Sequence, residues 1–104
     1  MADFLDIVGA SGTPYRFRRA SPQELPATAG NLVVATGSAA RLKVLFAGAA
    51  RSLARAEPVV SETLKANKAA RLFVRLNVAR TVREAEHADI VAGVSPETEA
   101  ADLD

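Results

Sequence analysis

The sequence contains no cysteine and no tryptophan, and it has one histidine and one tyrosine among its 104 residues. The lack of cysteine excludes disulfides, thiolate nucleophiles and cysteine-ligated zinc, and the single histidine excludes chemistry that needs several imidazoles. No apolar run approaches the roughly 18 residues of a membrane span. The N-terminus has no basic segment followed by an apolar stretch, so no signal peptide is expected. We therefore expect a cytoplasmic protein with no cofactor and no metal.

Length and composition favour one folded domain. A chain of 104 residues with 49% hydrophobic and 24% charged residues resembles an ordinary globular protein and is too short for two typical domains. Low hydrophobicity and high net charge, which keep a chain disordered, are both absent. We expect a single domain over residues 1–96, followed by an acidic C-terminal tail over residues 97–104.

The net charge of +1 conceals an uneven distribution along the chain. Residues 1–83 hold all 13 basic residues and five acidic ones, which gives +8, whereas residues 84–104 hold seven acidic residues and no basic one. A basic body attracts polyanions such as DNA or RNA. The acidic segment has three interpretations: it masks the basic body, it occupies a partner, or it only keeps the protein soluble.

The pattern of apolar residues predicts a small α/β sandwich. Short alternating or continuous apolar runs predict strands, and a 3.6-residue period predicts helices. Val78, Val82 and Ala85 form the expected inward face of the last helix. The expected strands are residues 15–19, 32–36, 42–47 and 71–77, with a helical turn at 21–24 and helices at 49–56, 58–68 and 78–94. This order implies a mainly antiparallel sheet of three to four strands flanked by helices.

This order of elements, together with the motifs in it, resembles the GIY-YIG nuclease superfamily, and most of all a small bacterial branch of single-domain GIY-YIG or excinuclease-like proteins. The resemblance covers about residues 8–96. Its segments are residues 9–15 in a loop and strand, 30–34 at the Gly-x-Tyr signature, 46–48 at the Tyr-x-Gly signature, 52–53 at a helix start, and 86–91 in the closing helix. It implies a GIY-YIG-like sandwich. In active members it also implies phosphodiester cleavage by two tyrosines, an arginine and a glutamate-held divalent metal.

The sequence departs from that family at each catalytic position. The signature tyrosines correspond to Leu32 and Phe46, the arginine to Ala56 and the glutamate to His87, whereas Gly48 keeps the glycine of the second signature. Without a hydroxyl there is nothing to deprotonate, and an imidazole does not suit hard Mg²⁺. We therefore expect a pseudo-nuclease with no catalytic residue, in which Leu32 and Phe46 pack into the core.

Basic residues are spread over several of the expected elements. If their faces converge, they form a surface that tracks phosphates, and Tyr15 and Phe17 are then placed to stack on bases. Strand alternation nevertheless favours core positions for both aromatics, and a basic surface without a nucleic-acid role is the commoner case. The candidate nucleic-acid-binding residues are Arg16, Arg18, Arg19, Arg41, Lys43, Arg51 and Arg55.

Three polar residues of the last helix have two interpretations each. His87 is a residual metal ligand or pH-sensitive contact, or else a solvated surface residue, and the lack of further imidazoles favours the solvated residue. Glu86 and Asp89 fall near the apolar side of the helix. They are remnants of a metal site or, as we favour, bonded locally to backbone amides or to an arginine such as Arg71 or Arg75.

Three functions from different classes remain open. The favoured one is a catalytically inactive binding module that contacts DNA or RNA through the basic surface. The second is a protein-interaction or regulatory module that uses the acidic tail, or a strand edge carrying Val33, Val34 and Val44, to bind another protein or a second copy. The third is a divergent metal-dependent nuclease. Nothing in the sequence points to a membrane or to a small-molecule substrate.

Overall fold

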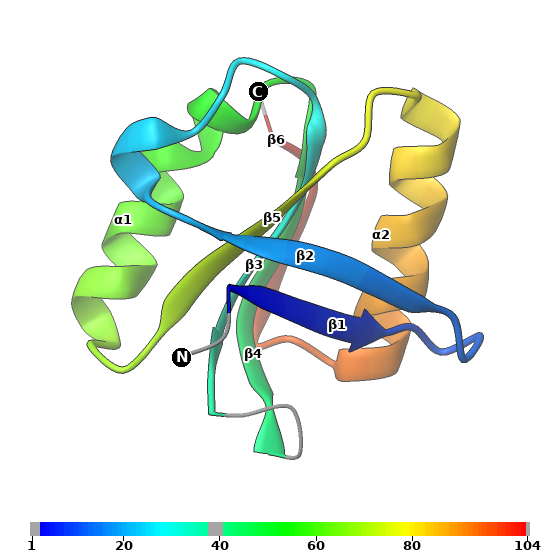
Figure 1. Ribbon diagram of the computed structural model, residues 1–104, viewed down its shortest axis with the longest axis horizontal. Coiled ribbons are helices and arrows are strands. Elements are labelled where there is room, and N and C mark those ends of the chain that lie inside the picture. The colour runs from blue at the N-terminus through cyan, green and yellow to red at the C-terminus, as the bar shows by residue number, and fades with distance from the viewer. Residues whose placement is uncertain (1–2, 38–40, 104) are drawn as a thin grey trace.

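Six strands form one mixed sheet with a helix on each side (Figure 1). The computed structural model describes residues 3–37 and 41–103. The strands are β1 (Phe4–Val8), β2 (Pro14–Ala20), β3 (Gly30–Thr36), β4 (Lys43–Ala50), β5 (Arg71–Leu76) and β6 (Thr98–Leu103). The helices are α1 (Glu57–Ala66) and α2 (Arg80–Val94), and the short 3-10 turns are η1 (Pro22–Glu24) and η3 (Leu53–Ala56).

The strand order in the sheet is β1-β2-β5-β3-β4-β6. Every neighbouring pair is antiparallel except β4 and β6, which run parallel with Phe46 opposite Thr98. β5 lies between β2 and β3, so it joins the β1–β2 hairpin to the β3–β4 hairpin. The two edges of the sheet are therefore β1 and β6.

Strand alternation divides the apolar residues into two layers, one on each face of the sheet. On β3, Leu32 faces the α1 side and Val33 faces the α2 side, and both are almost completely buried. The α1 layer contains Leu32, Val34, Leu45, Phe46, Leu53, Ala56, Val60, Ala70, Leu72 and Val74. The α2 layer contains Ile7, Phe17, Val33, Ala35, Val44, Ala47, Phe73 and Ile90. Neither helix in the described part of the chain is long and apolar enough to cross a membrane.

The sheet has six strands, more than the three to four expected. β1 was not expected, and residues 98–103 were expected in an acidic tail but form β6 instead; Asp104 lies outside the described residues. An edge strand is held by backbone hydrogen bonds to one neighbour and needs few apolar side chains, so composition gives little sign of it. The helix expected at 49–56 is also wrong, because Ala49 and Ala50 extend β4 and only η3 follows. The other expected strands and helices form at or within a few residues of their predicted places.

Helix α2 turns a different face to the sheet than its apolar period predicted. Val78 and Val82 are 73% and 46% exposed, whereas Arg83, His87 and Ile90 are buried. The sequence left open whether Val33, Val34 and Val44 lie at an exposed strand edge or are buried. All three are buried, because β5 and β6 flank the β3–β4 hairpin on both sides.

Candidate nucleic-acid interface

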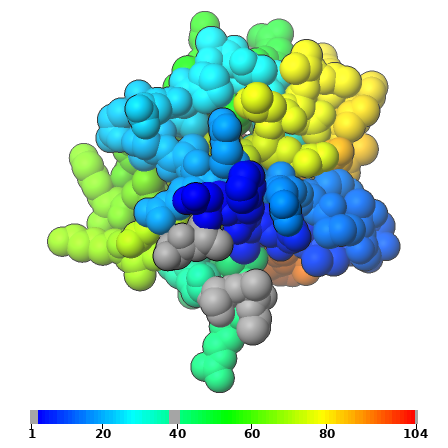
Figure 2. All heavy atoms as spheres, viewed as in Figure 1, coloured from blue at the N-terminus to red at the C-terminus, as the bar shows by residue number. Residues whose placement is uncertain are grey.

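The β1–β2–β5 side of the sheet has one face that neither helix covers. Residues on this face alternate with buried ones along β1 and β2, and we call it the open face. Its exposed members are Phe4, Asp6, Arg16, Arg18 and Leu76. In Figure 2 the dark blue atoms of β1 and the lighter blue atoms of β2 lie at the centre of the visible side, with no helix in front of them. Charged and apolar side chains therefore share one accessible surface.

Phe4 is the exposed aromatic residue of the open face, with 52% of its surface accessible. The guanidinium of Arg16 lies 5.3 Å from the centre of its ring, a cation–π contact. Arg16 also donates from Nε to Oδ1 of Asp6 at 3.1 Å, which raises the pKa of Arg16 and keeps it cationic. A hollow of about 200 Å³ is lined by Phe4, Arg16, Arg18, Val74, Arg75 and Leu76.

Arg18 adds a positive charge that no described residue neutralises. It lies between Phe4 and Val74 in the register of β1, β2 and β5, and its guanidinium has no ion pair or hydrogen bond with the part of the chain described. An exposed guanidinium beside an aromatic ring is the combination that single-stranded nucleic acids use, because phosphates need cations and bases need flat apolar surfaces.

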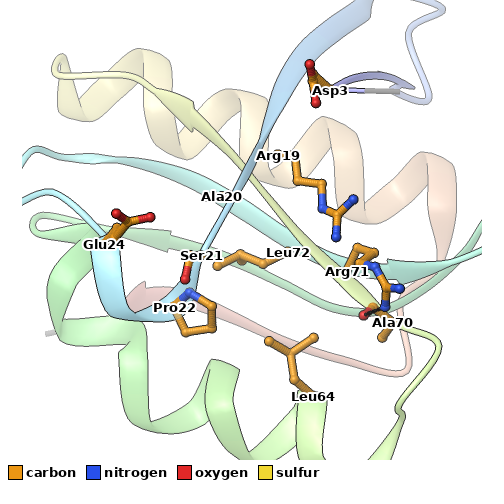
Figure 3. A pocket seen from close by; sticks show the side chains of 10 residues that line it. All are labelled: Asp3, Arg19, Ala20, Ser21, Pro22, Glu24, Leu64, Ala70, Arg71 and Leu72. Carbon is orange, nitrogen blue, oxygen red and sulfur yellow. Dashed lines mark hydrogen bonds between the residues drawn. The ribbon is translucent and has the colours of Figure 1, made fainter. Parts of the chain in front are cut away.

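A larger hollow of about 520 Å³ lies between the end of β2, the start of β5, and α1 (Figure 3), and it shares no lining residue with the hollow of the open face. Arg19 and Arg71 bring two guanidinium groups to one side of it, while Asp3 and Glu24 stand at its rim. Arg71 donates from one terminal nitrogen to the carbonyl oxygens of Lys68 and Ala70, at 3.2 and 2.9 Å. Its Nε is buried without a hydrogen-bond partner, which costs about 1–3 kcal/mol in a protein interior.

The seven candidate nucleic-acid-binding residues do not gather on one surface. Arg16, Arg18 and Arg19 lie on β2, but Lys43 begins β4 and Arg51 follows its last residue, so about 25 Å of strand separates these two. Lys43 is paired with Glu97 at 2.9 Å. Arg41 precedes β4, and Arg55 is exposed on η3. Only the β2 arginines adjoin the open face and the larger hollow. Sequence analysis missed two of their neighbours as binding residues, Phe4 and Arg71, although each opens a short, largely apolar run.

The positions that the resemblance to GIY-YIG nucleases equates with catalytic residues form no common cleft. Leu32, Phe46 and Ala56 are buried together in the α1 layer, with 0%, 4% and 0% of their surfaces exposed. The prediction that Leu32 and Phe46 pack into the core is confirmed. A Cβ at Gly48 would lie 3.0 Å from the ring of Phe46 and from Leu103 Cδ1, so this glycine makes room for both side chains. His87 lies on the other side of the sheet, on α2.

The sequence suggested that His87 is a solvated surface residue, but the structure shows that it is buried. Only 5% of its surface is exposed, and its Nε2 lies 2.8 Å from Oε1 of Glu99 on β6. The expectation failed because β6 covers this face of α2. The same contact ties the acidic C-terminal segment to the helix, in place of a loose tail.

Asp89 fastens the β1–β2 loop to α2. Its carboxylate accepts hydrogen bonds from the backbone N–H and the hydroxyl of Ser11, at 2.8 and 2.6 Å, and from the hydroxyl of Tyr15 at 2.7 Å. The hydrogen bond from the Ser11 hydroxyl is the largest cause that lowers the pKa of Asp89, followed by the hydrogen bond from Tyr15 and then that from the Ser11 backbone N–H. A Cβ at Gly9 would clash with Asp89 Oδ2, so a larger residue there would displace the carboxylate from its hydrogen bonds.

Glu86 is engaged by an arginine and an asparagine. Its Oε1 accepts from Arg75 Nε and from Asn77 Nδ2, both at 2.9 Å. Asn77 also donates to Asn31, a side chain that is 1% exposed and donates to the carbonyl of Arg83. The expectation that Glu86 and Asp89 bond locally, to an arginine and to a backbone amide, is confirmed. These carboxylates are held by donors within the chain and serve to position α2.

Within residues 3–37 and 41–103, no cluster of three or more histidine, aspartate or glutamate side chains is placed to hold a metal ion. No family model, curated protein or solved structure matches the chain. The chemistry of the open face and of the adjoining hollow is therefore the basis for a function.

Proposed function

We propose that this protein is a binding module for single-stranded nucleic acid, and that the open face is its contact surface. The observation that carries the proposal is the exposure of Phe4 beside Arg16 and Arg18 on a sheet face that no helix covers. The ring offers a stacking surface for a base, and the two guanidinium groups offer contacts to the flanking phosphates. A duplex, whose bases are already stacked on one another, uses only the charges.

We further propose that the domain is a GIY-YIG-like fold that has lost phosphodiester cleavage. The support is chemical: Leu32, Phe46 and Ala56 carry no group that could activate a nucleophile or offset charge on a phosphate. These side chains fill the α1 layer, where a catalytic cleft would need polar groups open to solvent. In this proposal the domain retains nucleic-acid contact and performs no reaction.

The test is a titration of fluorescein-labelled single-stranded oligonucleotides, in RNA and DNA versions, at several salt concentrations. We expect Phe4→Ala to weaken binding about 5- to 150-fold, because one base loses its stacking partner. Arg18→Ala should lower the slope of log K against log salt by roughly 0.7, because one phosphate contact is lost.

Arg55→Ala is the matched control, since it removes the same charge from η3, outside the open face. It should leave the affinity close to that of the native protein. Equal losses in Arg18→Ala and Arg55→Ala would show that binding follows net charge alone and would contradict the proposed surface. No binding of any oligonucleotide would favour the protein-interaction module, and cleavage of the oligonucleotide with Mg²⁺ or Mn²⁺ would refute the loss of activity.

A further inference from the structure

The hollow that holds Arg19 and Arg71 lies at the end of β2, and its chemistry differs from that of the open face. The open face mixes one aromatic ring with scattered charges, whereas this hollow places two guanidinium groups together (Figure 3). Its volume of about 520 Å³ falls in the range of small-molecule sites and exceeds what a phosphate alone would fill.

We propose that this hollow is a binding site for a phosphomonoester dianion with its attached nucleoside. An arginine fork matches phosphate geometry, and two adjacent forks favour a group with two negative charges over the single charge of an internal phosphodiester. Arg71 is already anchored through one nitrogen to two backbone carbonyls, so its plane is held at the wall of the hollow. Its buried Nε has an unmade hydrogen bond, and a small rotation that presents this N–H to the ligand would satisfy it.

The acidic rim restricts which ligands fit. Asp3 and Glu24 line the rim of the hollow, and their carboxylates can accept hydrogen bonds from sugar hydroxyls or base amino groups. The same carboxylates repel a second phosphate, so a diphosphate or triphosphate should bind more weakly than a monophosphate.

The position of the hollow indicates where such a phosphate comes from. Arg18 of the open face is followed directly by Arg19 of the hollow, so the two sites lie near each other at the end of β2, although successive side chains of a strand point to opposite faces of the sheet. A strand whose terminal phosphate occupies the hollow would have to pass around the end of β2 to reach the open face. This placement of a strand end rests on the proposed function, whereas recognition of the phosphomonoester itself does not.

The experiment compares five ligands by calorimetry and by chemical-shift changes in the native protein. The ligands are inorganic phosphate, a nucleoside 5′-monophosphate, and one oligonucleotide with a 5′-phosphate, a 3′-phosphate or hydroxyls at both ends. We expect one terminally phosphorylated form to bind about 10- to 100-fold tighter than the hydroxyl form. Arg71→Gln and Arg71→Lys should abolish the preference, the second because it keeps the charge and loses the fork.

Arg19→Gln provides an independent variant should the Arg71 variants fail to fold, and Arg80→Gln, at the start of α2, is the matched control that should keep the preference. In a third outcome, the native protein binds the mononucleotide, Arg19→Gln does not, and no oligonucleotide binds. This outcome would support the hollow as a site for a free nucleotide and refute the proposed function. Oligonucleotide binding that ignores terminal phosphates, with no binding of phosphate or mononucleotide, would overturn this inference and leave the proposed function standing.

Discussion

Tyr15 donates its hydroxyl hydrogen to Asp89 Oδ2 across 2.7 Å, although 74 positions separate the two residues in the chain. The bond joins β2 to α2 at the end of the sheet that carries the open face. It also links two titrations, because the hydrogen bond to Asp89 is the main cause that raises the pKa of Tyr15, and the same bond helps to lower the pKa of Asp89. The contact can therefore be tested by titrating either Tyr15 or Asp89.

The pKa of Tyr15 should be directly observable by ultraviolet absorbance, since the chain has one tyrosine and no tryptophan. We expect the phenolate to form with a midpoint above the ordinary value of about 10. In Asp89→Asn the midpoint should move down toward that value, because the acceptor's negative charge is gone. A midpoint that is the same in both proteins would show that Tyr15 and Asp89 are not in contact.

Acid should weaken the fold through Asp89. A carboxyl whose folded-state pKa is lowered stabilises the protein above its unfolded pKa of about 3.9, and this contribution is lost as the pH falls through the folded pKa. In denaturant melts the free energy of unfolding should therefore be larger for the native protein than for Asp89→Asn near pH 6. This difference should shrink below about pH 4. Ser11→Ala removes the largest cause of the lowered pKa and keeps the carboxylate, so it should show a smaller acid-dependent loss. A constant difference between the native protein and Asp89→Asn across this range would contradict the assignment.

Gly93 should resist a change that stabilises ordinary helices. In an open helix, replacing glycine by alanine gains about 1 kcal/mol. A Cβ at Gly93, however, would lie 2.7 Å from Ala10 N and 2.8 Å from Val8 O, in the backbone of the β1–β2 loop. We expect Gly93→Ala to destabilise the protein by about 1–3 kcal/mol, the usual cost of overpacking. Thermal and urea unfolding test the sign.

The neighbouring position supplies the comparison for that experiment. Ala92 is exposed on the same helix, so Ala92→Gly should show only the ordinary helix-propensity loss of about 1 kcal/mol. A stabilised Gly93→Ala protein would mean that the loop lies farther from α2 than the structure places it, and the contacts of Asp89 with Ser11 would then be in doubt as well.

Removing residues 97–104 should destabilise the protein, with no gain in its affinity for polyanions. The deletion strips β6 from β4, exposes Leu45, Phe46 and Gly48 at a strand edge, and removes Glu99 from His87. An unpaired edge recruits other chains, so light scattering should detect dimers or larger species and the melting temperature should fall. The double variant Glu99→Gln/Asp102→Asn keeps the strand and removes charge. A stable monomer after the deletion, with tighter oligonucleotide binding, would restore the masking interpretation.

Sequence analysis predicted the elements that carry a clear local signal, such as apolar alternation or a proline in the first helical turn. β5 alternates Leu72 and Val74 with Phe73 so that two layers are filled, and α1 begins with Pro58 in its first turn. β6 was missed because it pairs with β4, which is distant in the chain, and β1 was missed because an edge strand needs few apolar side chains. Phe46 pairs with Thr98, and nothing in either segment of the sequence indicates that the two strands are neighbours.

The candidate site was predictable only in part, for a similar reason. The β2 arginines were found from sequence, but the sequence could not show that Phe4 and Arg71 join them, because this depends on β1 and β5 lying on the two sides of β2. The face that α2 buries was misjudged because Arg83 and His87 are polar. Arg83 can nevertheless be buried because it donates hydrogen bonds to the carbonyl oxygens of Asn77 and Val78. His87 can be buried because its Nε2 lies within hydrogen-bond distance of Glu99.

The strand order turns the uneven charge of the chain into an electric dipole across the sheet. β2, with its three arginines, lies near one edge, and β6, with Glu99 and Asp102, forms the other. Four strand spacings separate them, roughly 19 Å at about 4.8 Å each, which is more than twice the Debye length of about 8 Å at physiological ionic strength. The acidic edge is thus too distant to cancel the arginines, yet at low salt it acts on the same approaching polyanion. We expect the protein to rotate in the electric field of a nucleic acid, so that β2 turns toward the phosphates and β6 turns away from them before any contact is made.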